Sequence, residues 1–496
     1  MSESTIAAYH QLFVGGEWVT PHSGRLIQSV DPSSGEIWAE VAEADGVDVD
    51  RAVEAAAAAF HGPWRQLTAS ERGDRLFALA GLLRARSSEL ATAESRDNGK
   101  PLTDTTGEIG RAADWLQYYA GAADKIQGST IPLRPTALAY TLREPVGVVA
   151  AITPWNSPIY LYAWKLGPAL AAGNTVVLKP AEQTSVSAQI LADLIREAGF
   201  PPGVVNIVPG YGAVAGRHLT SHPGVNKIAF TGAHSTAIAI LREAAASMKR
   251  VTCECGGKAP HIIFEDADIE SAAAVAVHSA FRSTGQSCAA GSRLFVQSLI
   301  YDDFLLAVSK LTKRIRVGPA LDSRTHIGPQ TSQEQLEKTL RYIALGKSEG
   351  SRLVGGGDRP SGSELRQGFY VNPTIFADVD NRSPLAQEEI FGPVLSVIRF
   401  ETEEDAVGMA NDTKYGLVAG LWTRDISRAH RVAHRLEAGF VSINTFRPVH
   451  WTLPYGGVKM SGIGRENGLE ALHQYTEVKT VVVDLSGQPG PDPFAR

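Results

Sequence analysis

Short runs of aliphatic and β-branched residues alternate with helix-like patterns in the middle of the chain. The runs are VGVVAAI, NTVVLK, VVNIV, NKIAF and VTCEC, all between residues 146 and 255. Helices are predicted between them, over 162–172, 185–198, 213–220 and 235–249. In the second helix Val186, Ile190 and Leu194 recur every four residues, so one face is apolar. This alternation predicts βαβ units and a parallel sheet.

A second alternating region runs from Asp268 to about Gly456. Its predicted strands are SRLFVQ, LSVIRF and GFVSIN, and its predicted helices are an Ala-rich one after Asp268, then 301–314, 333–348 and 402–411. Helical patterns dominate the first 120 residues, where the Ala, Leu, Glu and Arg content favours helix. Two α/β units are therefore expected.

Two β-rich segments far apart in the chain stand outside this alternation. They are TALAYTLRE (136–144) and YTEVKTVVVD (475–484). We expect exposed strands that pair with each other or across a subunit boundary. The Gly- and Pro-rich tail, 487–496, is expected to be loosely held.

Composition narrows the classes of function. At roughly 150 residues per domain, 496 residues predict about three domains or one unusually large one. A net charge of -6 gives no general attraction to nucleic acid or an anionic membrane. The most apolar stretch, 159–178, contains Lys165 and Pro168, which makes a poor membrane span. Neither nucleic acid nor a membrane is predicted as a partner.

The chain has only three cysteines, and their spacing does not form a disulfide framework. The N-terminus lacks a basic and apolar leader, so a reducing, cytoplasmic location is expected. Cys288 lies among small residues in FRSTGQSCAAGSR, which would expose its thiol to a cleft. The alternative for a lone cysteine is a buried core position. Cys253 and Cys255 are interpreted as core fillers, because no further ligand lies at metal spacing.

Eight short motifs follow one another over nearly the whole chain. They are PWNSP (154–158), LKPAE (178–182), FTG (230–232), CECGGK (253–258), GQSC (285–288), EEIFGPV (388–394), NDTKYGL (411–417) and PYGGVKMSGIGRE (454–466). Together and in this order they resemble the aldehyde dehydrogenase superfamily. The resemblance implies an α/β fold with a Rossmann-like cofactor domain (1–122 and 146–256), a related α/β catalytic domain (257–456) and a small β oligomerisation arm (123–145 and 474–496). It also implies assembly as a homodimer or homotetramer.

The resemblance implies NAD-dependent, non-acylating oxidation of an aldehyde to the carboxylic acid. Cys288 would be the nucleophile, forming a thiohemiacetal and then a thioester, and Glu254 would activate the hydrolytic water. The Asn156 side-chain amide would bind the oxyanion together with the Cys288 backbone N–H, since an amide donates without a charge. Lys165 and Glu466 would form a proton relay. Taken locally, Asn156 reads equally well as a turn residue and Glu254 as an edge-strand charge.

The implied cofactor is NAD, with NADP as the alternative. Lys179 and Glu182 follow a predicted strand and would reach the adenosine ribose, where a carboxylate repels a 2′-phosphate. Ala233 and Ala237 depart from the family's usual residues near the pyrophosphate. GYGAVAG (210–216) imitates a dinucleotide loop, but its third glycine is one residue late. The full set of expected cofactor residues is Ile152, Thr153, Pro154, Trp155, Lys179, Glu182, Gly212, Phe230, Thr231, Gly232, Glu389 and Phe391.

The resemblance places the aldehyde pocket on both sides of Cys288. Arg447 and His450 would attract a carboxylate at the far end of a semialdehyde, and Trp451 would stack on an aromatic aldehyde, unless this loop is plain surface. No metal is predicted: His430 and His434 lack the glutamate of a zinc-binding HExxH motif. The rival functions are a CoA-acylating or phosphorylating relative, or a catalytically silent structural relative. The expected pocket residues are Ser157, Leu161, Trp164, Phe281, Ser287, Arg447 and Trp451.

Overall fold

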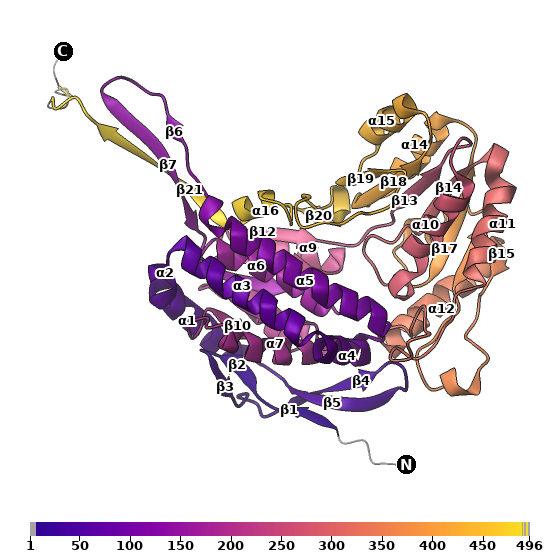
Figure 1. Cartoon of the computed structure of the whole chain (residues 1–496), viewed down its shortest axis with the longest axis horizontal. Helices are drawn as coiled ribbons and strands as arrows, with labels where there is room; N and C mark the ends of the chain where they lie inside the picture. The colour runs from indigo at the N-terminus through magenta and orange to yellow at the C-terminus, as the bar shows by residue number, and fades with distance from the viewer. Residues whose placement is uncertain (1–5, 489, 491–492, 495–496) are drawn as a thin grey trace.

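The computed structural model describes residues 6–488, 490, 493 and 494. Two large twisted sheets with helices on their faces form the body, and a narrow β arm projects from it (Figure 1). Among the described residues, every helix is too short or too polar to cross a bilayer.

The first large sheet has a parallel centre with antiparallel edges. Its central strands, each hydrogen-bonded to the next in parallel, are β12, β11, β8, β9 and β10. Their buried apolar runs are typical of parallel strands covered on both faces. In spatial order the described strands are β20 (Gly462–Ile463), β12 (Arg250–Glu254), β11 (Lys227–Thr231), β8 (Val148–Ile152), β9 (Thr175–Lys179), β10 (Val205–Ile207), β2 (Leu12–Val14) and β3 (Glu17–Val19).

The predicted βαβ units of this sheet are confirmed. The helix predicted at 162–172 begins four residues earlier, because Pro158 suits the first helical position. A π-helical turn at Gly212–Gly216 precedes the third helix. The crossover helices are α6 (Pro158–Ala171), α7 (Val186–Glu197), α8 (Arg217–Ser221) and α9 (His234–Ala245).

The N-terminal region contains the predicted helices and also strands that its helix-rich composition did not indicate. Strands β2 and β3 extend the first sheet, while β1 (Ala7–Tyr9), β5 (Glu36–Ala42) and β4 (Leu26–Asp31) form a separate small sheet. Helices α3 and α5 pack beside α6 (Figure 1). The helices are α1 (Gly46–His61), α2 (Pro63–Gln66), α3 (Ala69–Ala85), α4 (Ser87–Asn98) and α5 (Leu102–Ala122).

The second large sheet confirms the second alternating region. It is parallel except for its edge strand β15. The order is β15 (Arg352–Gly355), β16 (Thr374–Ala377), β17 (Val394–Phe400), β14 (Arg293–Gln297), β13 (Pro260–Ile263), β18 (Val418–Trp422) and β19 (Phe440–Ile443). The helices in the connections between these strands are α10 (Ile269–Phe281), α11 (Tyr301–Thr312), α12 (Gln333–Ser348), α13 (Pro384–Gln387), α14 (Glu403–Asn411) and α15 (Ile426–Arg435).

After the second sheet the chain returns to the first. Strand β20 pairs with β12, and the short helix α16 (Glu470–Gln474) leads into the arm. In the arm, β21 (Thr476–Asp484) runs antiparallel to β7 (Ala137–Pro145), which also pairs with β6 (Thr130–Ile131). The predicted pairing of these two distant segments is therefore confirmed. The expectation of a loosely held tail falls partly on 489, 491–492 and 495–496, which lie outside the described residues.

Candidate active site

Cys288 lies in the loop that joins α10 to β14. The preceding residues Ser283, Thr284 and Gly285 all have left-handed backbone, with φ of 52°, 57° and 69°. Left-handed backbone in the two residues with a Cβ is strained, and such strain often marks functional sites. Gln286 anchors the loop, because its Oε1 accepts the Thr331 N–H at 2.9 Å. The thiol is consequently presented at a fixed place rather than buried in the core.

Two cavities meet at Cys288. One has a volume of about 270 Å³ and the other of about 210 Å³. Both are lined by Asn156, Leu161, Thr231, Glu254 and Cys288. A molecule entering from either side therefore meets the same thiol, amide and carboxyl group.

Asn156 is nearly buried just before helix α6. Its Nδ2 donates to the backbone carbonyl of Gln286 at 3.1 Å, which ties the amide to the loop of the nucleophile. An amide nitrogen carries two hydrogens, so one remains for a ligand. The predicted juxtaposition of Asn156 with Cys288 is present.

Glu254 ends strand β12 and is 4% exposed. Its backbone carbonyl accepts the Gly232 N–H at 3.0 Å, while its buried Oε2 has no hydrogen-bond partner among the described residues. Burial raises the pKa of this carboxyl well above its usual value, and the neighbouring Glu466 raises it further, whereas Lys165 acts in the opposite direction. A carboxyl group with a raised pKa can exchange protons near neutral pH.

Lys165 and Glu466 form a fully buried ion pair behind Glu254. Lys165 Nζ donates to Glu466 Oε1 at 2.6 Å, although the residues are 301 positions apart. Glu466 Oε2 has no partner among the described residues. The pair acts electrostatically on Glu254, as a relay would require, but it joins Glu254 by no hydrogen bond in the described structure.

Burial also raises the pKa of the Cys288 thiol, to about 11. The nearby guanidinium of Arg447 and a hydrogen bond with Tyr455 act in the opposite direction. The thiol therefore holds its proton at neutral pH and needs a base when it reacts.

A third cavity, of about 620 Å³, extends along the carboxyl ends of β8, β9 and β11. Ligands bind at this edge of open α/β sheets. Buried hydroxyls of Thr153 and Thr231 lack partners among the described residues, and the N-cap residue of α9, Ala233, provides no side-chain cap. Unsatisfied hydroxyls and free helix N–H groups fit the sugar and phosphate oxygens of a dinucleotide. The expected residues that line this cavity are Ile152, Thr153, Pro154, Trp155, Lys179, Glu182, Gly212, Phe230, Thr231 and Gly232.

Lys179 is buried at the end of β9. Its Nζ donates to the Pro180 carbonyl at 2.8 Å and lies 3.5 Å from Glu182 Oε2. Burial lowers the pKa of Lys179. Arg217, also in this cavity, pairs with Glu243 at 3.1 Å, so its guanidinium is already engaged.

Glu389 and Phe391 line the smaller cavity beside Cys288, opposite Trp155. The Phe391 and Trp155 rings meet edge to face, 5.2 Å apart. Glu389 Oε1 accepts the Gly257 N–H at 3.0 Å, and burial raises the pKa of Glu389 to about 7. A Cβ at Gly256 would lie 2.0 Å from the Glu389 carboxylate, which explains the glycine at this close approach.

The 270 Å³ cavity contains part of the expected aldehyde pocket. Ser157, Leu161, Trp164, Ser287 and Arg447 line it. Ser157 Oγ accepts from Lys100 Nζ at 2.8 Å. This hydrogen bond fixes the small residue at the pocket wall.

Two expected pocket residues and His450 are not among the lining residues. Phe281 is 1% exposed in the core between α10 and α11. The Trp451 ring packs edge-on against Trp115, with 5.5 Å between the ring centroids. It also packs against the His450 ring at a centroid distance of 3.8 Å, so Trp451 and His450 contact each other. The sequence analysis assigned no role to several further lining residues. Gln286 and Tyr455 lie inside two of the motifs, whereas the others lie outside them: Glu108, Arg111, Tyr160, Arg282, Ser235, Thr236 and Lys338.

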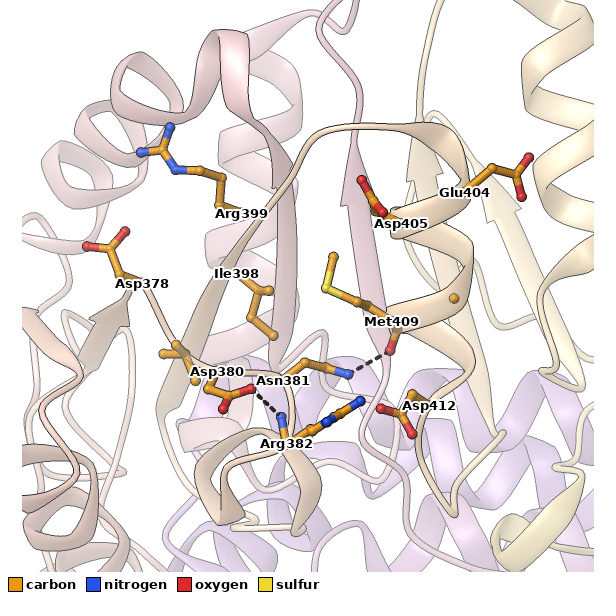
Figure 2. A pocket seen from close by; sticks show the side chains of 12 residues that line it. Asp378, Asp380, Asn381, Arg382, Ile398, Arg399, Glu404, Asp405, Met409 and Asp412 are labelled. Atoms are coloured by element: carbon orange, nitrogen blue, oxygen red, sulfur yellow. Dashed lines mark hydrogen bonds between the residues drawn. The ribbon is translucent and has the colours of Figure 1, made fainter.

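A separate hollow of about 890 Å³ lies beside α14 and shares no residue with these cavities. Figure 2 shows its acidic side chains and two of its hydrogen bonds, from Arg382 N to Asp380 Oδ1 and from Asn381 Nδ2 to the Met409 carbonyl. Across the described part of the chain, no cluster of three or more His, Cys, Asp or Glu side chains is placed to hold a metal. Cys253 and Cys255 are buried in the core of the first sheet, as predicted.

Comparison with known proteins agrees with this geometry. Residues 18–481 match the aldehyde dehydrogenase family. An aldehyde dehydrogenase of Emericella nidulans is 46% identical over 97% of this chain and 96% of its own, and a mitochondrial aldehyde dehydrogenase of Sus scrofa is 47% identical over 96% and 92%. The NAD+ complex of a Bacillus cereus aldehyde dehydrogenase superposes with a TM-score of 0.94 at 43% identity, covering 96% and 97% of the two chains. This chain, in which Cys288 lies at the junction of two cavities, therefore belongs to the aldehyde dehydrogenase family.

Proposed function

We propose that the protein oxidises an aldehyde to its carboxylic acid with NAD+ and water. The observation that carries the proposal is the junction at Cys288, where a thiol, an amide donor and a buried carboxyl face two cavities. The 270 Å³ cavity holds the aldehyde, and the 620 Å³ and 210 Å³ cavities hold the cofactor. The NAD+ complex of the Bacillus cereus relative supports the choice of cofactor.

Cys288 Sγ adds to the aldehyde carbon while its proton passes to a base, for which Glu254 is the candidate. Asn156 Nδ2 and the Cys288 backbone N–H donate to the resulting oxyanion. Bound NAD+ supplies the acceptor for the hydride that leaves this carbon, and a thioester to Cys288 remains. Glu254 first releases the thiol proton to solvent. The ionised Glu254 then takes a proton from water, the water oxygen adds to the thioester carbon, and the C–S bond breaks to release the acid and the Cys288 thiolate.

The ion pair of Lys165 and Glu466 modulates Glu254 and completes the proton route in this proposal. Its effect on the Glu254 pKa supports the electrostatic part of that role. The Glu182 carboxylate favours NAD over NADP, because it would repel a 2′-phosphate. Arg217, a candidate partner for such a phosphate, is paired with Glu243. Glu254 at the junction favours transfer of the acyl group to water over transfer to CoA.

We assign 1–122 and 146–256 to a cofactor domain, 257–456 to a catalytic domain, and 123–145 with 474–496 to an arm. Exposed Leu138, Leu142, Val478 and Val482 on the arm support self-association as a dimer or tetramer. Three free cysteines, including a nucleophile that must stay reduced, support a cytoplasmic location.

The test is NADH formation from a panel of aldehydes, with NAD+ or NADP+ and with or without CoA. We expect NADH and free acid without CoA, and a loss of about 10³-fold or more in Cys288→Ala. Cys253→Ala, in the buried core, is the matched control and keeps its activity. NADH formation that needs CoA, or that survives in Cys288→Ala, contradicts the proposal.

A further inference from the structure

We propose that the aldehyde cavity is built for aldehydes that carry a carboxylate, which Arg111 and Arg447 bind together with the Tyr160 hydroxyl. This inference rests on the proposed function and names its substrate class. All three residues line the 270 Å³ cavity that contains Cys288.

The charges of this cavity do not balance. Its ionisable lining consists of three arginines and two glutamates besides the nucleophile and tyrosines: Arg111, Arg282, Arg447, Glu108 and Glu254. Glu108 is neutralised by Lys100 at 2.6 Å, and Arg282 by Asp104 at 3.1 Å. Glu254 is the buried base. Arg111 and Arg447 remain, and neither forms an ion pair with any described residue.

Arg111 comes from helix α5 and Tyr160 from helix α6. The guanidinium carbon of Arg111 lies over the Tyr160 ring, 5.6 Å from its centroid. This stacking fixes the plane of the guanidinium while leaving its N–H donors for a ligand. The two helices pack against each other, so the pair is held by the scaffold rather than by a loop.

Arg447 comes from the loop after β19 and has left-handed backbone with φ of 53°. Its N–H donates to Ser442 Oγ at 3.3 Å, and its guanidinium donates to Ser287 Oγ. Ser287 is the residue before the nucleophile. A strained residue whose charged side chain reaches the reacting centre is held there at a cost to stability, which indicates a functional role.

Both guanidiniums act electrostatically on the Tyr160 hydroxyl. Burial raises the pKa of Tyr160 to about 12, while Arg111 and Arg447 both act to lower it. The Tyr160 hydroxyl therefore keeps its proton and donates a hydrogen bond to an anion. Arginine suits a carboxylate because its planar fork forms two parallel hydrogen bonds.

The cavity also limits the size of the substrate. A volume of about 270 Å³ lies at the lower end of the range for small-molecule sites. It suits an aldehyde with a short chain or a single ring between the aldehyde and the carboxylate. We therefore infer small semialdehydes and formyl-aryl acids as the substrate class.

The experiment compares matched pairs that differ in the charged end. The probes are 4-oxobutanoate against butanal and 4-formylbenzoate against 4-methylbenzaldehyde, each with saturating NAD+. For the native enzyme, we expect kcat/KM to be about tenfold or more higher for the carboxylate of at least one pair. In Arg447→Met and in Arg111→Met, that ratio of carboxylate to neutral aldehyde falls by about tenfold or more. Arg314→Met, at an exposed arginine outside the site, leaves the ratio and the rates unchanged.

Neutral aldehydes that match or exceed both carboxylates in the native enzyme overturn this inference and leave the proposed function standing. An unchanged ratio in both arginine variants also overturns it, because turnover of the neutral aldehyde reports whether each variant is folded. Absence of NADH from every aldehyde instead defeats the proposed function itself, and this inference with it.

Discussion

The cavities on the two sides of Cys288 differ in the elements and side chains that line them. The cofactor side lies at the ends of β8, β9 and β11, and glycines and small hydroxyl residues line it together with side chains that end the strands, such as Lys179 and Phe230. The aldehyde side is lined by long charged and aromatic side chains from α5, α6 and two irregular loops. The cofactor side is thus built on the ends of sheet strands, whereas the aldehyde side is built on helix and loop side chains that can change without disturbing a sheet. Substitutions on the two sides are therefore expected to differ in which aldehydes they affect.

The largest effect is expected at Glu254, which belongs to both sides. Glu254→Gln keeps the shape but removes the base, so turnover should fall by about 10²–10⁴-fold. The fall should be the same for charged and neutral aldehydes, measured as steady-state NADH formation. Glu270→Gln, at an exposed position of α10, is the control. A loss confined to one class of aldehyde would place Glu254 on the substrate side alone.

Gly257→Ala tests the close backbone approach between Gly257 and the loop that carries Cys288. The added Cβ would lie 2.8 Å from the Cys288 carbonyl oxygen and 3.2 Å from Leu417 Cβ, so the nucleophile must move. We expect kcat to fall by about 10²-fold for every aldehyde, because a displacement of about 1 Å has that effect on a reacting group. Gly81→Ala, in helix α3 with nothing near its Cβ, should keep full activity. Full activity in Gly257→Ala would show that this backbone contact is dispensable.

The pH dependence of turnover tests the proposed role of Glu254, which lines the cavities on both sides. Because burial and Glu466 raise the Glu254 pKa, this base gains its charge only as pH rises. We expect kcat to rise with pH, by up to about tenfold per unit while Glu254 is still protonated. The rise should disappear in Glu254→Gln. A kcat that falls with rising pH across the neutral range would contradict the assignment.

The smallest effect concerns the scaffold of the aldehyde side. Glu94 Oε1 accepts the Ile159 N–H at 2.6 Å at the start of α6, and burial raises its pKa to about 8. The folded state thus holds a proton that the unfolded chain loses above about pH 4.3. The free energy of unfolding should therefore fall as pH rises toward 8, by up to about 1.4 kcal/mol per unit from this group. Glu94→Gln should flatten that slope in denaturant titrations at several pH values. An unchanged slope would mean that Glu94 is ionised in the folded state.

The cofactor side was the easier to predict from sequence. Its residues directly follow buried strands, so a motif and the end of a strand fix their place together, as at Lys179 and Thr231. The aldehyde side depends on which long side chain reaches a cavity from a helix or loop. Arg111 lies in none of the eight motifs, and the Trp451 ring packs against Trp115 and does not line the cavity. The short strands β2 and β13 were not predicted, whereas the equally short β10 and β19 were, because these two lie within the longer apolar runs VVNIV and GFVSIN.

The chain's return to the first sheet has a consequence for synthesis. Cys288, Asn156 and Glu254 all lie at least 178 residues before Glu466, which pairs with Lys165. A nascent chain can fold its N-terminal sheet and expose its thiol long before residue 466 leaves the ribosome. The ion pair of Lys165 and Glu466 can form only after residue 466 has been synthesised. Chains that end before residue 466 therefore contain Cys288 but lack the ion pair that influences the pKa of Glu254.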